Sequence, residues 1–205
     1  MLKRTFDIVF SIVGLVVLSP ILLTVALLVK LTSRGPVFYR GVRTGLHGKP
    51  FRIYKFRSMI VDAEKVGGTT TADRDPRITR VGHFLRKFKI DEFPQLLNVL
   101  KGEMSFVGPR PEVAEYTDSY TDEEKMILSV KPGITDFSSI EFHDLQAHLG
   151  AQNAEQFFRN HILKTKNQLR IKYVREKSFW IDMKILFVTM WILAKKPFVK
   201  RLPRC

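Results

Sequence analysis

The chain has 205 residues, 45% of them hydrophobic, and a formal net charge of +14. This length favours one domain with a hydrophobic core of its own, without the disulfide or metal staples that much smaller chains need. Cys205 is the only cysteine. The sequence therefore excludes an internal disulfide framework, and it predicts a domain that does not depend on an oxidising compartment.

The positive charge is concentrated at the two ends of the chain. Residues 1–60 carry a net charge of +9 and residues 161–205 a net charge of +10, whereas residues 61–160 carry −5. Nucleic acid and an anionic membrane surface both attract such ends. Here the basic residues border apolar runs at 8–29 and 181–194, which a nucleic-acid groove binder does not need. The pattern favours a membrane surface and predicts no nucleic-acid partner.

Residues 8–29 carry no charge and reach the length of roughly 20 residues that a helix needs to cross hydrocarbon. The run is longer than the core of a signal peptide, about 7 to 15 residues, and no small-x-small cleavage pattern precedes Lys30. On hydropathy alone, an ordinary spanning helix is the main alternative.

Two features argue against a simple crossing. Ser19-Pro20 lies in the middle of the run, where proline removes a helical hydrogen bond and favours a sharp bend. Both flanks are basic, so a full crossing would leave one of them on the wrong side. We therefore predict a re-entrant helix over residues 1–34, broken at Ser19 and Pro20, with both ends and residues 35–205 on the cytosolic face.

Residues 37–43 and 51–56 are rich in aromatic and β-branched side chains, and the segment between them contains Gly45. This pattern predicts a small β-hairpin. Lys55 and Arg57 lie two residues apart, which places them on one strand face. They could bind a phosphate together, although a solvated strand face is the commoner explanation.

Residues 81–89 predict a short basic helix, and residues 91–102 predict a second helix with an apolar stripe. Pro94 suits a first helical turn and Gly102 the position just past the end, so Asp91 and its neighbour Glu92 are expected at the N-terminus. An acidic helix cap is the ordinary explanation for such a pair.

Basic residues surround this acidic pair, with Arg86 before it and Arg110, in a Gly-Pro-Arg-Pro segment, after it. A carboxylate among cations is expected to have a low pKa, and so to act as a nucleophile or metal ligand rather than as an acid. A carboxylate that approaches a pyrophosphate meets like charge, which a bridging Mg²⁺ would cancel. The arginines would neutralise charge on the transferring and leaving groups.

The last third of the chain predicts two helices. Residues 155–177 are polar and basic, and residues 178–194 are apolar apart from Asp182 and Lys184. The apolar helix is short for a membrane span, and its tryptophans and basic flank are typical of a helix at the headgroup level. A buried core helix is the alternative. The expected fold is thus α/β and mostly helical, with a small hairpin and interfacial amphipathic helices.

Four motifs in this order resemble those of the monotopic bacterial sugar transferases, also called small phosphoglycosyl transferases. They lie at residues 51–59, 75–82, 91–102 and 104–111. Lys3-Arg4-x-x-Asp7, Ser19-Pro20 and the segment 180–185 extend the resemblance over nearly the whole chain.

The resemblance implies a ping-pong transfer of a sugar phosphate from a UDP-sugar to polyprenyl phosphate, with release of UMP, at the cytosolic face of the bacterial inner membrane. It implies that Asp91 is the nucleophile and a Mg²⁺ ligand, and that Glu92 helps to position or deprotonate. Arg86 is implied to contact phosphate, and Arg110 to face the nucleotide.

Three further residues match positions with polar functional or supporting roles in similar proteins: Lys55, Arg57 and Asp182. Residues 136–144 depart from the Gly-Leu-x-Gln-x-x-Gly-Arg type of run that many relatives have, so the sequence does not identify the sugar. It also leaves open whether the protein forms a homodimer. The alternatives from other classes are a membrane-tethered nucleic-acid or lipid-binding module, with the acidic pair only a helix cap, and a non-catalytic scaffold.

Overall fold

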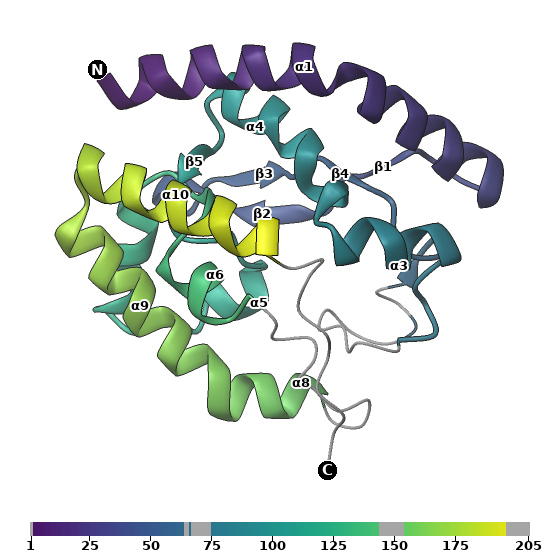
Figure 1. Cartoon of the computed structure of the whole chain (residues 1–205). Helices are drawn as coiled ribbons and strands as arrows, with labels where there is room; N and C mark the ends of the chain where they lie inside the picture. Colours follow the sequence, from purple (N-terminus) through teal and green to yellow (C-terminus); the bar gives the residue numbers. More distant parts are fainter. Residues whose placement is uncertain (1, 64–65, 67–74, 144–153, 196–205) are drawn as a thin grey trace.

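The structure is a computed structural model that describes residues 2–63, 66, 75–143 and 154–195, and it is mostly helical with small two-stranded sheets (Figure 1). In chain order the elements are α1 (Leu2–Thr32), β1 (Phe38–Tyr39), β2 (Val42–Thr44), η1 (Leu46–Gly48), β3 (Pro50–Arg52), β4 (Lys55–Phe56), α3 (Arg80–Lys87), η2 (Ile90–Gln95), α4 (Leu96–Lys101), β5 (Ser105–Val107), α5 (Ala114–Thr117), η3 (Glu124–Ser129), β6 (Gly133–Thr135), α6 (Phe137–Glu141), α8 (Ala154–Phe157), η4 (Phe158–Ile162), α9 (Leu163–Glu176) and α10 (Phe179–Lys195).

The N-terminal apolar run forms one continuous helix, α1, which passes through Pro20. The predicted break at Ser19-Pro20 is therefore corrected to a bend, and Figure 1 shows α1 changing direction part-way along. Proline has no N–H to donate to the carbonyl of Val16, four residues earlier. The hydroxyl of Ser19 donates to that carbonyl instead, at 2.7 Å, and Thr24 donates to the carbonyl of Pro20 at 2.8 Å. The Ser19 hydroxyl thus satisfies the one carbonyl that Pro20 leaves without a backbone donor.

Helix α1 lies along one side of the molecule rather than projecting from it (Figure 1). Four of its residues are buried against the domain: Asp7, Ser11, Val25 and Val29. Most of its large apolar side chains are exposed instead. In the part of the chain that the structure describes, α1 is the one helix long and apolar enough to cross a membrane, by length and composition.

The first turns of α1 are attached to the domain by polar contacts. The ammonium of Lys3 lies 2.6 Å from the carboxylate of Asp182 and donates to the carbonyl of Val107. Arg4 donates to the carbonyls of Val99 and Leu100 at the C-terminal end of α4, at 2.6 and 2.9 Å, where the helix dipole favours a cation. The carboxylate of Asp7 accepts from Ser105 in β5.

The other end of α1 is held by Arg57. Its guanidinium, which is buried, donates to the carbonyls of Ser33 and Arg34 at 2.8 Å each. One side chain therefore satisfies carbonyls just past the end of α1, a common use of a cation near a helix C-terminus. Both ends of α1 are thus bonded to the same domain.

The predicted hairpin is confirmed, as two antiparallel ladders rather than one. Strand β1 pairs with β4, and β2 pairs with β3. Between the ladders the regular pairing is interrupted, although Ile53 still donates to the carbonyl of Gly41 at 3.0 Å. A parallel pair, β5 with β6, was not predicted from the sequence.

The two helices predicted near the C-terminus are confirmed. Helices α8 and α9 continue into each other through the π-helical turn η4. Helix α10 buries Ile185 in a cluster with Val107, Tyr173 and Val174, and it exposes Trp180, Phe187 and Trp191 on its other side. It is therefore a core helix on one face and an exposed apolar helix on the other.

We expect Arg57→Met to lower the free energy of unfolding by about 2 to 4 kcal/mol, because it removes charge-assisted hydrogen bonds and leaves carbonyls unpaired. Thermal unfolding in lipid nanodiscs would measure the change. Arg52→Met is the matched control, since Arg52 is exposed and has a single 3.4 Å contact with the carbonyl of Arg40. Equal midpoints for the two variants would contradict this role of Arg57.

Candidate active site

The acidic pair lies in a tight turn rather than at the start of a long α-helix. The predicted helix over 91–102 is divided into the 3₁₀ turn η2 and the six-residue α4. Glu92 donates its N–H to the carbonyl three residues earlier, at 3.2 Å, as in a 3₁₀ turn, and Pro94 has no N–H with which to extend an α-helical ladder. Lys89 and Gln95 occupy the N-cap positions of η2 and α4. Asp91 and Glu92 therefore do not occupy a helix N-cap, which was the ordinary explanation for an acidic pair at this place in the sequence.

A cavity of about 590 Å³ opens between the hairpin and η2. Its lining contains six of the residues predicted for the site: Lys55, Arg57, Arg86, Asp91, Glu92 and Arg110. These side chains come from parts of the sequence as far apart as β4 and the segment after β5. The fold thus brings together cations and carboxylates that the sequence separates.

Two cations hold the carboxylate of Glu92. The ammonium of Lys55 lies 3.1 Å from Oε1, and the guanidinium of Arg110 forms a two-point contact, with Nη1 3.1 Å from Oε2 and Nη2 bonded to Oε1. Burial alone would raise the pKa of Glu92, but the charges of Arg110 and Lys55 outweigh it and hold this pKa well below its usual value. Glu92 is therefore a fixed anion at neutral pH.

Asp91 has a different environment, although it is the next residue. Its side chain is buried, and Oδ1 has no hydrogen-bond partner among the residues that the structure describes. Burial and the adjacent charge of Glu92 raise the pKa of Asp91, an effect that Lys55 and Arg86 offset only in part. The low pKa expected for Asp91 is thus wrong; the low pKa belongs to Glu92, which takes the cations.

Arg86 lies on α3 and faces the same cavity. Burial lowers the pKa of its guanidinium, and the carboxylates of Asp91 and Glu92 act in the opposite direction. Within the described ranges its side chain has no hydrogen bond or ion pair of 4 Å or less. Arg86 is therefore available to an anion that enters the cavity, in contrast to Arg110.

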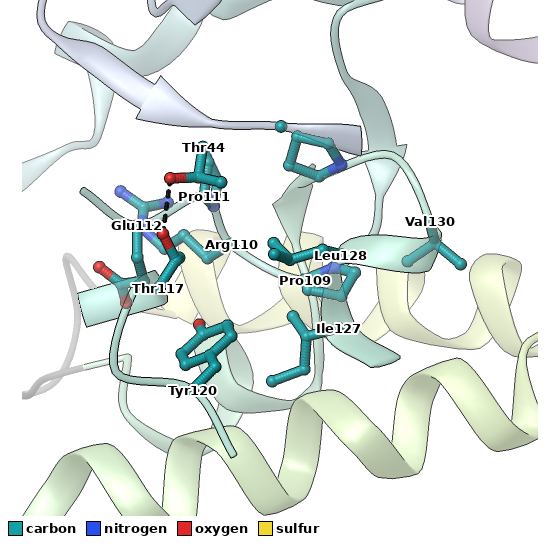
Figure 2. Close-up of a pocket in the computed structure, with 12 residues that line it drawn as sticks. Thr44, Pro109, Arg110, Pro111, Glu112, Thr117, Tyr120, Ile127, Leu128 and Val130 are labelled. Carbon is teal, nitrogen blue, oxygen red and sulfur yellow. Dashed lines mark hydrogen bonds between the residues drawn. The ribbon is translucent and has the colours of Figure 1, made fainter. Parts of the chain in front are cut away.

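The segment that carries Arg110 is fixed from several sides. Its backbone N–H donates to the buried carboxylate of Asp136 at 3.2 Å, and Thr44 donates to the carbonyl of Glu112 at 2.9 Å. Figure 2 shows this segment beside Thr44 and Thr117, whose hydroxyls are 2.8 Å apart. The gap beneath the segment measures only about 10 Å³, so this region is packed rather than a second ligand site.

Two residues predicted for the site have other contacts. Asp182 does not line the cavity; it binds Lys3 and accepts from the hydroxyl of Tyr173 at 2.8 Å. Arg57 lines the cavity, but its guanidinium is bonded to carbonyls at the end of α1. The structure therefore gives both residues a role in holding α1 and does not bring either charge to Asp91.

The cavity also contains cations that the site prediction omitted: Arg40, Arg43, Arg77 and Lys89. Lys89 could have been found from its position two residues before Asp91. The sequence placed Arg40 and Arg43 only in the first strand of the hairpin. It did not show that they face the acidic pair, because strand pairing determines that.

The two carboxylates lead to opposite expectations for stability. Glu92→Gln leaves Lys55 and Arg110 without their anion, so we expect the free energy of unfolding to fall by roughly 3 kcal/mol or more. Asp91→Asn removes a buried charge that repels Glu92 and whose Oδ1 accepts no hydrogen bond from the described residues, so stability should stay equal or rise. Thermal unfolding of both variants at pH 7 would test this, and a lower midpoint for Asp91→Asn would contradict it.

Comparison with known protein families gives a match over most of the chain. The model of a family described as bacterial sugar transferase matches residues 1–196. The chain is 40% identical to UDP-glucose:undecaprenyl-phosphate glucose-1-phosphate transferase of Escherichia coli K12, over 93% of this chain and 40% of that protein. It is 37% identical to undecaprenyl-phosphate galactose phosphotransferase of Salmonella typhimurium, over 95% of this chain and 41% of that protein.

A shorter relative is matched over most of its length. The chain is 40% identical to the uncharacterized sugar transferase EpsL of Bacillus subtilis, over 92% of this chain and 85% of that protein. The chain therefore spans less than half of several curated relatives but nearly all of this one.

Proposed function

We propose that this chain, which belongs to the bacterial sugar transferase family, moves a sugar 1-phosphate from a UDP-sugar to polyprenyl (undecaprenyl) phosphate and releases UMP. The names of its relatives give this class of donor and acceptor. The observation that carries the proposal is the buried Oδ1 of Asp91, which has no hydrogen-bond partner among the described residues and lies beside a fixed Glu92 in a cation-lined cavity. Such a transfer begins the assembly of a bacterial polysaccharide or other glycoconjugate.

The proposed reaction has two steps. In the first, an oxygen of the Asp91 carboxylate forms a bond to the β-phosphorus of the UDP-sugar, and the bond from that phosphorus to the oxygen bridging the two phosphates breaks. UMP leaves with the bridging oxygen, and the sugar phosphate stays on Asp91. In the second step, an oxygen of polyprenyl phosphate attacks the same phosphorus and the Asp91 carboxylate is released.

The neighbouring residues have distinct parts in this proposal. Asp91 suits the nucleophile because no hydrogen bond in the described part of the chain occupies its Oδ1. Glu92 orders Arg110 and Lys55 at the reactive centre, where their excess positive charge faces incoming phosphates. Arg86 binds phosphate oxygens, since no carboxylate of the described residues lies within ion-pair distance of its guanidinium and it lines the cavity. Arg57 and Asp182 support the reaction from a distance by holding α1 in place.

The residues present fit a Mg²⁺ ion that is shared with the substrate. No group of three or more metal-ligating side chains occurs in the described part of the chain, which argues against a site built from protein alone. The carboxylate of Asp91 would supply one ligand, since Mg²⁺ commonly combines one or two carboxylates with substrate phosphates. When bound, the ion would neutralise the repulsion between carboxylate and pyrophosphate.

We also propose that α1 enters one leaflet and returns, so that the domain lies on the cytosolic face of the inner membrane. Lys3 and Arg4 at one end of α1, and Ser33 and Arg34 just past the other end, bond to the same domain. A spanning helix would place its ends on opposite sides of a hydrocarbon layer about 30 Å thick, where one domain could not bond to both. The exposed apolar face of α10, with tryptophans at both ends, suits a helix at the headgroup level.

The first test is UMP release from a panel of UDP-sugars with undecaprenyl phosphate and Mg²⁺. Wild type should release UMP with at least one donor, and Asp91→Asn should lose at least about 1,000-fold in rate, as expected when a nucleophile is removed. Intact-protein mass spectrometry should detect a sugar phosphate on wild type when the acceptor is omitted. Asp118→Asn, an exposed acidic residue, is the control and should keep full activity. Turnover by a folded Asp91→Asn protein would exclude Asp91 as the nucleophile.

Single cysteines in a Cys205→Ser background would test the membrane placement. Leu2→Cys and Leu31→Cys are at exposed positions near the two ends of α1. Both should resist a membrane-impermeant maleimide in intact spheroplasts and react in inverted vesicles. Val17→Cys is equally exposed in the protein but should react slowly in both, because lipid covers it. Labelling of either end from outside the spheroplast would contradict the re-entrant arrangement.

A further inference from the structure

Lys89 has an unusual backbone for its residue type. It connects α3 to η2 with φ 59° and ψ 18°, in the left-handed region. A side chain with a Cβ is disfavoured there, whereas glycine and asparagine adopt this conformation more readily. A lysine in this place is therefore not explained by the turn itself, since either of those residues would form it more easily.

The turn at Lys89 places its side chain on the wall of the reactive cavity. The backbone N–H of Lys89 donates to the carbonyl of Arg86 at 3.3 Å, and its carbonyl accepts from Glu92 at 3.2 Å. Lys89 lines the cavity together with Arg86 and Asp91. Lys87, two residues earlier, is exposed and lies over the ring of Phe88 instead, outside the cavity lining. Two neighbouring lysines thus have different surroundings.

The charge of Lys89 has no counter-charge in contact with it among the described residues. Glu92 engages Lys55 and Arg110, and carbonyls beyond α1 engage Arg57. The ammonium of Lys89, by contrast, has no hydrogen bond and no ion pair within 4 Å among the residues that the structure describes. Its place in the cavity lining makes this ammonium available to an anion that enters the cavity.

We propose that Lys89 binds a non-bridging phosphate oxygen of a substrate in the cavity, next to Asp91. An ammonium on a flexible stem is a point charge that can follow a phosphate as it moves between bound positions. Strained backbone at such a position is consistent with a functional site. This inference rests on the proposed function for the identity of the phosphate, which is either the pyrophosphate of the donor or the phosphate of the lipid acceptor.

Three substitutions separate the charge of Lys89 from its backbone. Lys89→Asn removes the charge and suits the left-handed conformation, so its thermal midpoint should equal or exceed that of wild type. Lys89→Arg keeps the charge. Lys87→Asn is the matched control, because it removes a neighbouring lysine that does not line the cavity.

We expect Lys89→Asn to raise the KM for one phosphate substrate by about tenfold, the loss of one charge-assisted contact. A raised KM for the UDP-sugar would identify the donor, and a raised KM for undecaprenyl phosphate the acceptor. Lys87→Asn should stay within about threefold of wild type, and Lys89→Arg, which keeps the charge, should recover part of the affinity that Lys89→Asn loses. KM values for both substrates that are the same in Lys89→Asn and Lys87→Asn would overturn the proposal.

A binding measurement separates this inference from the proposed reaction. Inorganic pyrophosphate with Mg²⁺ should raise the thermal midpoint of wild type and of Lys87→Asn, and about tenfold more pyrophosphate should be needed to stabilise Lys89→Asn equally. If no UDP-sugar yields UMP, this binding difference would still support a phosphate contact at Lys89. Equal stabilisation of all three proteins would overturn it, whatever the outcome of the activity assay.

Discussion

Glu92 forms ion pairs with Lys55 and Arg110, and these two pairs determine which contacts are left for Asp91. Because one carboxylate takes both cations, the other is left buried with an oxygen that accepts no hydrogen bond in the described part of the chain. The pKa of Asp91 is thus raised and the pKa of Glu92 is lowered, although both residues are acidic and adjacent. A charged oxygen kept without partners is costly to the fold. That cost is easiest to understand if a substrate or an ion becomes the partner.

The sequence predicted most of the helices, because periodicity and proline are local signals. The hairpin, α3 and the C-terminal helices were found in this way. Six of the residues predicted for the site line one cavity, and their roles in the reaction stay a prediction. The errors concern tertiary contacts. The sequence could not show that the hydroxyl of Ser19 would replace the bond that Pro20 removes, and so predicted a break. It could not show that Arg57 and Asp182 would be committed to α1, since their partners lie far away in the chain.

The environment of Asp91 was missed for a related reason. A count of nearby cations predicted a low pKa, but the count does not show which carboxylate the cations contact. Burial and side-chain geometry decide that, and they favour Glu92. The parallel pairing of β5 with β6 was also beyond the sequence, since each strand is only three residues long and has no alternation to recognise.

The attachment of α1 at both ends has a consequence for protein engineering. A membrane anchor is often treated as exchangeable, since any apolar helix of sufficient length will insert. Here Lys3 of the helix is the cation paired with Asp182, and the end of the helix positions the carbonyls of Ser33 and Arg34 that accept from Arg57. Replacement by a straight anchor, or deletion of α1, would leave the buried Asp182 without its cation and would release the carbonyls that the end of α1 presents to the buried Arg57. Helix α1 is thus joined to the folded domain at both ends, and removing it would remove part of the structure of that domain.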